Sequence, residues 1–332
     1  MAYNCRIYLV FSPHQALAVD RIIRSSAAAQ RTVIITTIRT SQKFTGCEII
    51  SFLPLSSFKN FAAELVFRNR RKTLRHLFKT IEDKAKIELL VPHYQHILSN
   101  YLAFFLLSKS NVRRALIPDG ILSLYEHRVN YRDIIKQTTY KIFAITIGLN
   151  FKFLWRSINF PDDRNSEIYT YFPDCVYNRS AEVISIPVKK RKLSERFSGV
   201  VILGTNNYRR DHFSYAKQVV LHLNNDLSGN QVYFKKHPAL RGEDPILRQL
   251  RDQDHGFAVR EIPQSEAIEG IIERYSLFKI IDLAFSTSTV ELQLIYCNKL
   301  DISVYEPILL SHPRYSRTFR DLMDKFNLKQ IC

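Results

Sequence analysis

The sequence has few cysteines, no long apolar run and no leader-like start, and each absence excludes a class of protein. Its five cysteines, an odd number, are scattered without a CxxC or other metal-ligand spacing, so neither a zinc site nor a disulfide framework is predicted. No apolar run is long enough to span a bilayer, and the start lacks the basic head and apolar middle of a signal peptide. We therefore expect a cytoplasmic protein with free thiols.

The chain has a single tryptophan and fewer acidic than basic residues, and both facts bear on binding to nucleic acid. Trp155 is the only tryptophan, and few aromatic residues interleave with the basic runs, so no stacking groove for nucleic acid is predicted. The 48 Lys and Arg outnumber the 31 Asp and Glu, which gives a formal net charge of +17. Such a field concentrates phosphates, nucleic acids or anionic lipid surfaces.

The length and the order of apolar runs predict two α/β domains. At 332 residues and 46% hydrophobic composition, the chain is long enough for two cores. Strand-like residues 5–11 and 32–38 enclose a helix-like stretch, 14–29, which is the βαβ opening of a parallel sheet. The pattern restarts at the apolar run 200–203. We predict doubly wound domains at 1–185 and 199–332, joined by a basic linker at 186–198.

The first motif that carries chemistry is Asp119-Gly120, which follows the apolar run 115–118. It is predicted at the carboxyl end of a buried strand, where open α/β sheets bind ligands. Gly120 allows a positive φ or a close backbone approach. A base for a sugar hydroxyl needs such a placement. The alternative is an ordinary turn, which Pro-Asp-Gly forms readily.

The second motif, Lys235-Lys236-His237-Pro238, ends the strand-like run 231–234. Two lysines and a histidine at one strand end can bind a phosphate, and a protonated imidazole can neutralise or protonate a departing phosphate oxygen. A surface histidine beside solvated lysines is the alternative.

The third motif, Ser286-Thr287-Ser288-Thr289, follows the strand-like run 278–285 and precedes a helix-like stretch, 290–296. Hydroxyls and free backbone amides would meet there at a helix amino terminus, which is an anion site. Simple N-capping is the alternative, and it is compatible with phosphate binding. Asp252-Gln253-Asp254 spells the DxD that holds a metal in one class of nucleotide-sugar enzymes, but it lies in a polar stretch and is interpreted as a solvated turn.

In this order and setting, the motifs resemble those of bacterial sialyltransferases with acidic-Gly, His-Pro and Ser-Ser/Thr motifs, namely the lipooligosaccharide sialyltransferases and the polysialyltransferases of capsule and O-antigen loci. Ser12-Pro13-His14-Gln15 also resembles the opening of that group. Pro118 departs from the pattern, because the family often has a second acidic residue there. The predicted domain pair corresponds to the GT-B architecture, two Rossmann-like domains facing a cleft.

The resemblance implies an inverting transfer of sialic acid from CMP-sialic acid to a galactoside of a bacterial surface glycan. It makes Asp119 the base and His237 the residue that faces the CMP phosphate, with Gln15 and Gly120 on the acceptor side. No metal or cofactor is expected, because lysines, histidine and hydroxyls meet the leaving-group charge. The predicted donor-binding residues are Gly204, Thr205, Asn206, Lys235, Lys236, His237, Pro238, Ser286, Thr287 and Ser288.

Two other functions remain as alternatives. Another CMP- or CDP-linked transferase of surface polymers, such as a glycerophosphate or Kdo transferase, would use similar domains and motifs. A basic nucleic-acid-binding protein would explain the charge but not the motifs, so no nucleic-acid partner is expected. A lipid-linked acceptor would place the enzyme at the inner face of the cytoplasmic membrane, where the basic stretch 68–79 could dock; a solvated helix surface is the alternative for that stretch.

Overall fold

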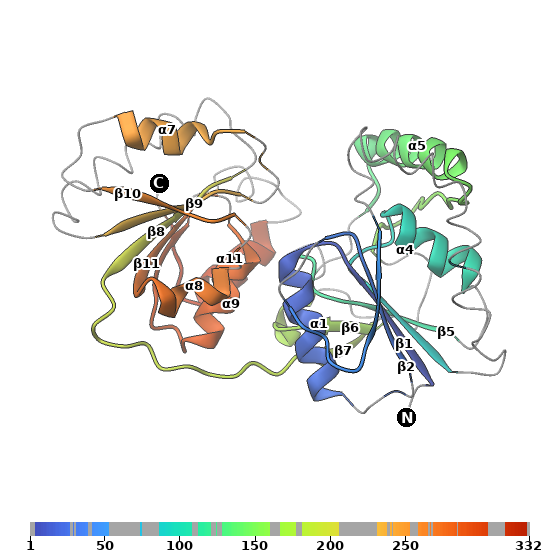
Figure 1. Ribbon diagram of the computed structural model, residues 1–332, viewed down its shortest axis with the longest axis horizontal. Coiled ribbons are helices and arrows are strands. Elements are labelled where there is room, and N and C mark those ends of the chain that lie inside the picture. Colours follow the sequence, from blue (N-terminus) through green and yellow to red (C-terminus); the bar gives the residue numbers. More distant parts are fainter. Residues whose placement is uncertain are drawn as a thin grey trace. The chain divides into compact units, whose positions relative to one another are not determined.

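The chain divides into two units, Met1–Pro187 and Val188–Cys332, and each is described by itself. Figure 1 shows the computed structural model. The structure describes residues 4–26, 29, 31–38, 42–52, 74, 86–107, 112–120, 124, 128–159, 167–176, 181–205, 231–237, 240, 242–252, 258–264, 266, 268–283, 285–304 and 316–330.

The first unit is built on a seven-stranded parallel sheet with the order β3-β2-β1-β4-β5-β6-β7. This is the Rossmann order, extended by one strand, and the order reverses between β1 and β4. The strands are β1 (Cys5–Val10), β2 (Arg31–Thr36), β3 (Glu48–Ser51), β4 (Ile87–Val91), β5 (Val112–Leu116), β6 (Glu167–Thr170) and β7 (Glu182–Ser185).

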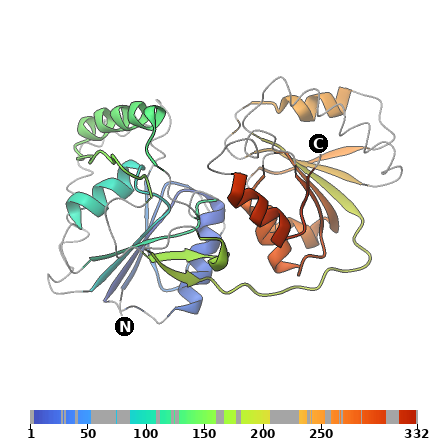
Figure 2. The same cartoon turned by 180° about the vertical axis from the view of Figure 1, so that it is seen from behind.

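Helices cover both faces of this sheet (Figure 2). Right-handed crossovers that leave the centre in opposite directions must lie on opposite faces, so α1 lies on one face and α4 with α5 on the other. Ile7 and Leu9 of β1 share a core with Tyr101 of α4 and Ala144 of α5. The helices are α1 (Pro13–Ser25), α4 (Ile97–Tyr101), the π-helical turn η1 (Leu102–Leu106), α5 (Tyr131–Thr146) and the 3-10 turn η2 (Pro173–Cys175).

The second unit repeats this plan with six parallel strands in the order β10-β9-β8-β11-β12-β13. The order reverses between β8 and β11. Helix α7 covers one face, and α8, α9 and α11 cover the other (Figure 1). The elements are β8 (Gly199–Leu203), β9 (Val232–Lys235), α7 (Pro245–Asp252), β10 (Val259–Ile262), α8 (Ile268–Arg274), β11 (Leu277–Asp282), α9 (Thr287–Ile295), β12 (Asp301–Val304), α11 (Ser316–Lys325) and β13 (Lys329–Gln330).

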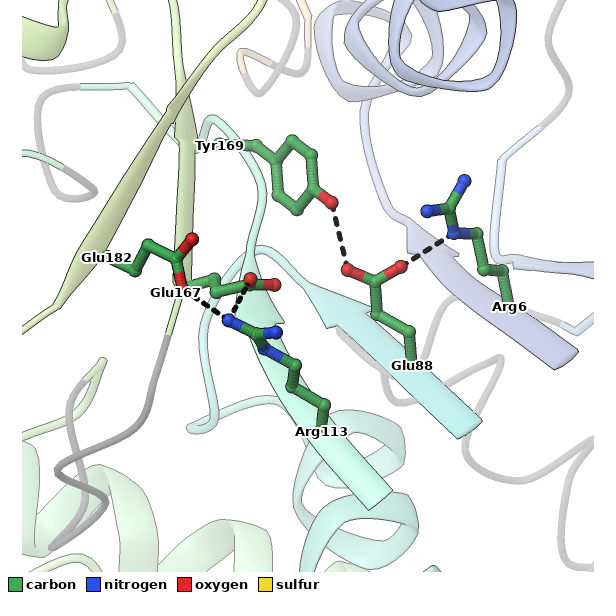
Figure 3. A network of polar contacts seen from close by, with 6 residues as sticks. All are labelled: Arg6, Glu88, Arg113, Glu167, Tyr169 and Glu182. Carbon is green, nitrogen blue, oxygen red and sulfur yellow. Dashed lines mark hydrogen bonds and ion pairs between the residues drawn. The ribbon is translucent and has the colours of Figure 1, made fainter. Parts of the chain in front are cut away.

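A network of charged groups crosses the first sheet near the amino ends of its strands (Figure 3). Arg6 donates from Nε to Glu88 Oε2 at 2.7 Å, and the Tyr169 hydroxyl donates to Glu88 Oε1 at 2.9 Å. Glu88 is fully buried, so these two donors replace the water that its carboxylate would otherwise bind. The drawn residues are Arg6, Glu88, Arg113, Glu167, Tyr169 and Glu182.

Glu167 is the unusual acid of this network. It is 3% exposed and pairs with Arg113, which also pairs with Glu182. Burial, together with the neighbouring carboxylates of Glu88 and Glu182, raises the pKa of Glu167 to about 7, although Arg113 opposes the shift.

Part of the expected linker lies against the second unit. Lys190 donates from Nζ to the carbonyl of Leu294 at 2.8 Å, and Arg191 pairs with Glu273 at 2.9 Å. The basic run therefore has local partners on helices α8 and α9.

The predicted doubly wound fold is confirmed, and so are its central strands. Expected strands at 5–11, 32–38, 200–203, 231–234 and 278–285 correspond to β1, β2, β8, β9 and β11. The edge strands β3, β7, β10 and β13 and the neighbouring strand β12 were not predicted. Among the described residues, no helix has the length and apolar content required to cross a bilayer.

Candidate functional site

Asp119 lies beyond the carboxyl end of β5, where Gln15 of α1 holds it. Gln15 Nε2 donates to Asp119 Oδ1 at 2.7 Å, and Gln15 Oε1 accepts from the Phe11 backbone N–H at 2.7 Å. Because that N–H can only donate, the orientation of the amide is fixed and its NH₂ must face the carboxylate. Gly120 has φ 65°, the left-handed conformation that glycine adopts without strain.

His93 is the second group that faces Asp119. Its Nε2 lies 3.8 Å from Asp119 Oδ2, and the side chains of His93 and Asp119 are 25% and 23% exposed. Gln15, at 3% exposed, is buried beneath them. One carboxylate oxygen is therefore fixed by an amide, while the other faces an imidazole and remains within reach of solvent.

His96 supports the same edge from below. It stacks on Phe11 with ring centroids 3.8 Å apart, and its Nδ1 accepts from the Leu98 backbone N–H at 3.2 Å as the N-cap of α4. Burial, with smaller contributions from His93 and Lys136, lowers the pKa of His96 to about 3. A neutral imidazole is required for the cap, because Nδ1 must accept a hydrogen bond there. The residues that follow β1, β4 and β5 meet where the strand order reverses, which is the ligand-binding position of such sheets.

In the second unit, the loops after β8 and β9 are packed closely together. The Gly204 backbone N–H donates to the Lys235 carbonyl at 2.9 Å. A Cβ at Gly204 would lie 2.9 Å from Asp244 Oδ2 and 3.1 Å from the Phe234 ring, so no larger residue fits without a shift. Asp244 is fully buried, and its Oδ1 accepts from the Ile246 backbone N–H at 2.9 Å.

His237 lies at the end of this pair of loops. Burial and the Lys235 charge lower the pKa of His237, while Asp244 opposes the shift. Gln264 fixes the backbone there, because its Nε2 donates to the His237 carbonyl at 2.7 Å. In the unliganded protein the neutral imidazole is favoured, and an incoming anion would favour the charged form.

Ser286 caps helix α9 on the far side of β8. Its Oγ accepts from the Ser288 backbone N–H at 3.2 Å, so the capping interpretation of this motif is correct. Fully buried Asp282 accepts from the Ser286 N–H at 2.6 Å and from the Thr289 hydroxyl at 2.9 Å. Between them, Phe285 has φ 49°, a strained conformation that recurs at ligand-binding loops. The loop is therefore held in shape by a buried carboxylate.

The predicted donor-binding residues that the structure describes gather at one edge of the second sheet. The loops after β9, β8 and β11 lie on neighbouring strands, with β8 and β11 flanking the reversal of strand order. The ammonium of Lys235 lies 3.5 Å from the Pro263 carbonyl, and that of Lys236 contacts the Gly242 carbonyl. Thr205 is buried.

Some predicted residues cannot be placed. Asn206, Pro238, the side chain of Thr287 and the basic stretch 68–79, except Leu74, lie outside the described residues. Within the part of the chain that the structure describes, no group of three His, Cys, Asp or Glu side chains could hold a metal ion.

Sequence reasoning missed three groups. They are His93, which follows β4, Asp282, which ends β11, and Asp244, which precedes α7. A search for every titratable residue at or after the end of an apolar run would have found His93 and Asp282. Asp244 carries a weaker signal, since it precedes Pro245 as an N-terminal cap residue.

Comparison with known proteins supports the fold and leaves the activity open. No protein-family model matches the sequence, and no curated protein matches it. A solved glycotransferase of kitacinnamycin is similar over 99% of this chain and 86% of that chain, at 10% identity and a TM-score of 0.52. A sialyltransferase from Photobacterium damsela matches 99% of this chain and 81% of its own, at 12% identity and a TM-score of 0.46. A structure of S. aureus MnaA with UDP matches 92% of this chain and 80% of its own, at 10% identity and a TM-score of 0.47. The chain thus has the two Rossmann-like domains of the GT-B fold.

Proposed function

We propose that the protein is a glycosyltransferase that moves sialic acid from CMP-sialic acid to a galactoside of a bacterial surface glycan, with inversion. The observation that carries the proposal is the held carboxylate: Gln15 fixes one oxygen of Asp119 at 2.7 Å and leaves the other beside His93. A general base must be oriented in this way and still be reachable by an acceptor hydroxyl.

In the proposed reaction, Asp119 takes the proton of the acceptor hydroxyl while the hydroxyl oxygen forms a bond to the anomeric carbon of sialic acid. The bond from that carbon to the CMP phosphate breaks, and the phosphate takes the electron pair. Gln15, an acceptor-side residue whose side chain is buried, positions the base through its hydrogen bond to Asp119.

The second unit offers groups for the leaving phosphate. We place the leaving phosphate at the amino end of α9, where the Ser286 and Ser288 hydroxyls lie and where Asp282 holds the loop in shape. His237 gains a proton more readily once a phosphate lies beside it, because the anion offsets the burial and the Lys235 charge that lower its pKa. We propose the inner face of the cytoplasmic membrane as the place of reaction, because surface-glycan acceptors are built on lipids.

The test is CMP release from CMP-sialic acid with a panel of galactosides. Asp119→Asn should reduce transfer by about 10²–10⁴-fold and leave CMP binding unchanged, because a base is lost and no donor contact. Asp174→Asn, at an exposed aspartate of the same unit, is the matched control. Gln15→Leu should lower kcat with little change in the donor KM.

Two results would decide against the proposal. Activity only with CMP-Kdo or only with CDP-glycerol as the donor, and none with CMP-sialic acid, would assign the chain to a different transferase class. Full activity of Asp119→Asn would remove the base from the mechanism.

A further inference from the structure

Helix α5 exposes large apolar side chains on the face that points away from its own core. Tyr131, Ile135, Ile142 and Ile145 are 76%, 50%, 59% and 60% exposed. At 100° per residue they fall on one side of the helix, opposite buried Ala144. Monomeric soluble proteins seldom leave such a patch uncovered.

The threonines of α5 make this face more apolar than their composition indicates. Thr138, Thr139 and Thr146 each donate the hydroxyl to the carbonyl four residues earlier, at 2.9, 3.2 and 2.7 Å. All three are exposed, yet each hydroxyl is satisfied within the helix instead of by water. Back-bonded threonine is suited to an environment that offers no hydrogen bonds.

Basic residues border the apolar face on both sides. On the helical wheel, Arg132 and Lys136 lie along one margin and Lys141 along the other. The only acid in the helix is Asp133, which is engaged with Asn130 in the capping box. Long basic side chains at the margins of an apolar stripe can reach anionic groups while the stripe is buried.

Trp155 extends the face beyond the helix. It is 72% exposed and stacks on Phe153 with ring centroids 5.5 Å apart, and Lys141 Nζ lies 5.1 Å from the Phe153 ring. Gln137 anchors the segment through both the N–H and the carbonyl of Leu154, at 2.7 and 3.1 Å. Tryptophan favours the boundary between headgroups and acyl chains.

We propose that this surface, the exposed side of α5 together with Trp155 and hereafter the α5 face, docks the first unit onto an anionic membrane surface. Apolar side chains would enter the headgroup boundary, and Arg132, Lys136 and Lys141 would contact lipid phosphates. A second copy of the chain fits less well, since a two-fold contact would bring these basic margins together on a molecule of net charge +17.

A backbone hydrogen bond links the segment after α5 to the candidate acceptor site. The Tyr94 backbone N–H, next in sequence to His93, donates to the Ile158 carbonyl at 3.2 Å, which ties the Trp155 segment to the strand end that carries His93. The inference deepens the proposed function, because a docked unit would hold Asp119 near the headgroup layer where a lipid-linked glycan begins.

Vesicle binding tests the inference without measuring transfer, so its failure is distinguishable from failure of the proposed function. The protein should sediment with vesicles of phosphatidylglycerol mixed with phosphatidylcholine, less with phosphatidylcholine alone, and less as salt is added. Trp155, the only tryptophan, reports the contact directly. Its emission should shift to shorter wavelength and be quenched by brominated acyl chains.

A matched pair of variants separates the α5 face from general hydrophobicity. Ile142→Asp with Ile145→Asp should weaken the vesicle partition coefficient by at least about tenfold. Ile49→Asp, at a 51% exposed isoleucine of edge strand β3, should leave it unchanged. Arg132→Gln with Lys141→Gln should reduce the preference for phosphatidylglycerol and its salt dependence. Circular dichroism and thermal unfolding of each variant confirm that the fold is kept.

Three outcomes would overturn the inference. They are equal binding to both vesicle types, tryptophan emission that does not respond to vesicles, and a parent dimer that Ile142→Asp with Ile145→Asp converts to a monomer without any vesicle binding. The last would make the α5 face an interface between copies.

Discussion

Replacing Arg6 with methionine should destabilise the first unit strongly, because it removes one partner of a buried ion pair. Arg6 and Glu88 are register neighbours on β1 and β4, 2.7 Å apart, with side chains 10% and 0% exposed. Methionine fills much of the same volume but leaves the Glu88 carboxylate buried without its guanidinium partner, while the Tyr169 hydroxyl still donates to it at 2.9 Å.

The expected magnitude comes from the burial. Removing one partner of a buried ion pair costs about 3–5 kcal/mol of unfolding free energy, and the remaining Tyr169 bond argues for the lower end, about 3 kcal/mol. At roughly 2–4 °C per kcal/mol for a unit of this length, its unfolding transition should fall by about 6–12 °C. Adding Glu88→Leu removes the stranded charge and should restore stability to within about 1 kcal/mol of the parent.

Calorimetry can follow the transition of the first unit in the parent, Arg6→Met and the double variant. Arg31→Met is the control, because Arg31 and Glu48 also pair at 2.7 Å on neighbouring strands but with side chains 32% and 40% exposed. Its cost should stay below about 1 kcal/mol. If Arg6→Met costs no more than the control, or if Glu88→Leu fails to rescue it, the reasoning from buried charge is refuted.

Further predictions concern pH and packing. The pKa of Glu167 is raised to about 7 from its usual 4.5, so the folded state retains a proton that the unfolded chain releases. The stability of the first unit should therefore fall as the pH rises through about 7. In thermal unfolding, Glu167→Gln should flatten this dependence on pH. Because the pKa of His237 is lowered, CMP binding should be accompanied by uptake of a proton and should tighten as the pH falls. Binding calorimetry in buffers of different ionisation enthalpy would detect the proton uptake, and His237→Asn should abolish it. Gly204→Ala places a Cβ 2.9 Å from Asp244 and should cost about 1–3 kcal/mol in denaturant unfolding, whereas Gly270→Ala, with nothing within 4 Å, should be neutral or stabilising.

The central strands could be predicted because they are buried on both faces. Strand β1 is buried at every position, and so are β4 and β8, so each appears in the sequence as a mostly apolar run, interrupted by Arg6 in β1 and by Glu88 in β4. Edge strands β3 and β7 are largely exposed and short, so their sequences, Glu-Ile-Ile-Ser and Glu-Val-Ile-Ser, resemble loops. Periodicity could not separate them from a turn.

The candidate site was predictable only in part, and for a physical reason. Asp119 and Gln15 are separated by 104 positions, and their contact depends on which strands are neighbours, which no local pattern encodes. Asp282 was interpreted as part of a strand because it ends one, yet its buried carboxylate shapes the Ser286 loop. The network around Glu88 was missed because isolated charges within apolar strands carry no signal until their register is known.

The first sheet separates groups that stabilise from groups that could react. Arg6 and Glu88 occupy the second positions of β1 and β4, whereas Gln15 and His93 follow the carboxyl ends of the same strands. Opposite ends of a strand are separated by its length, so removing a charge at one end should not change the contacts of Asp119 at the other. Arg6→Met should therefore lower stability and leave the activity of the folded fraction intact, whereas Gln15→Leu should lower the activity of the folded fraction itself. A variant at the amino edge that abolished activity without unfolding the unit would contradict this division.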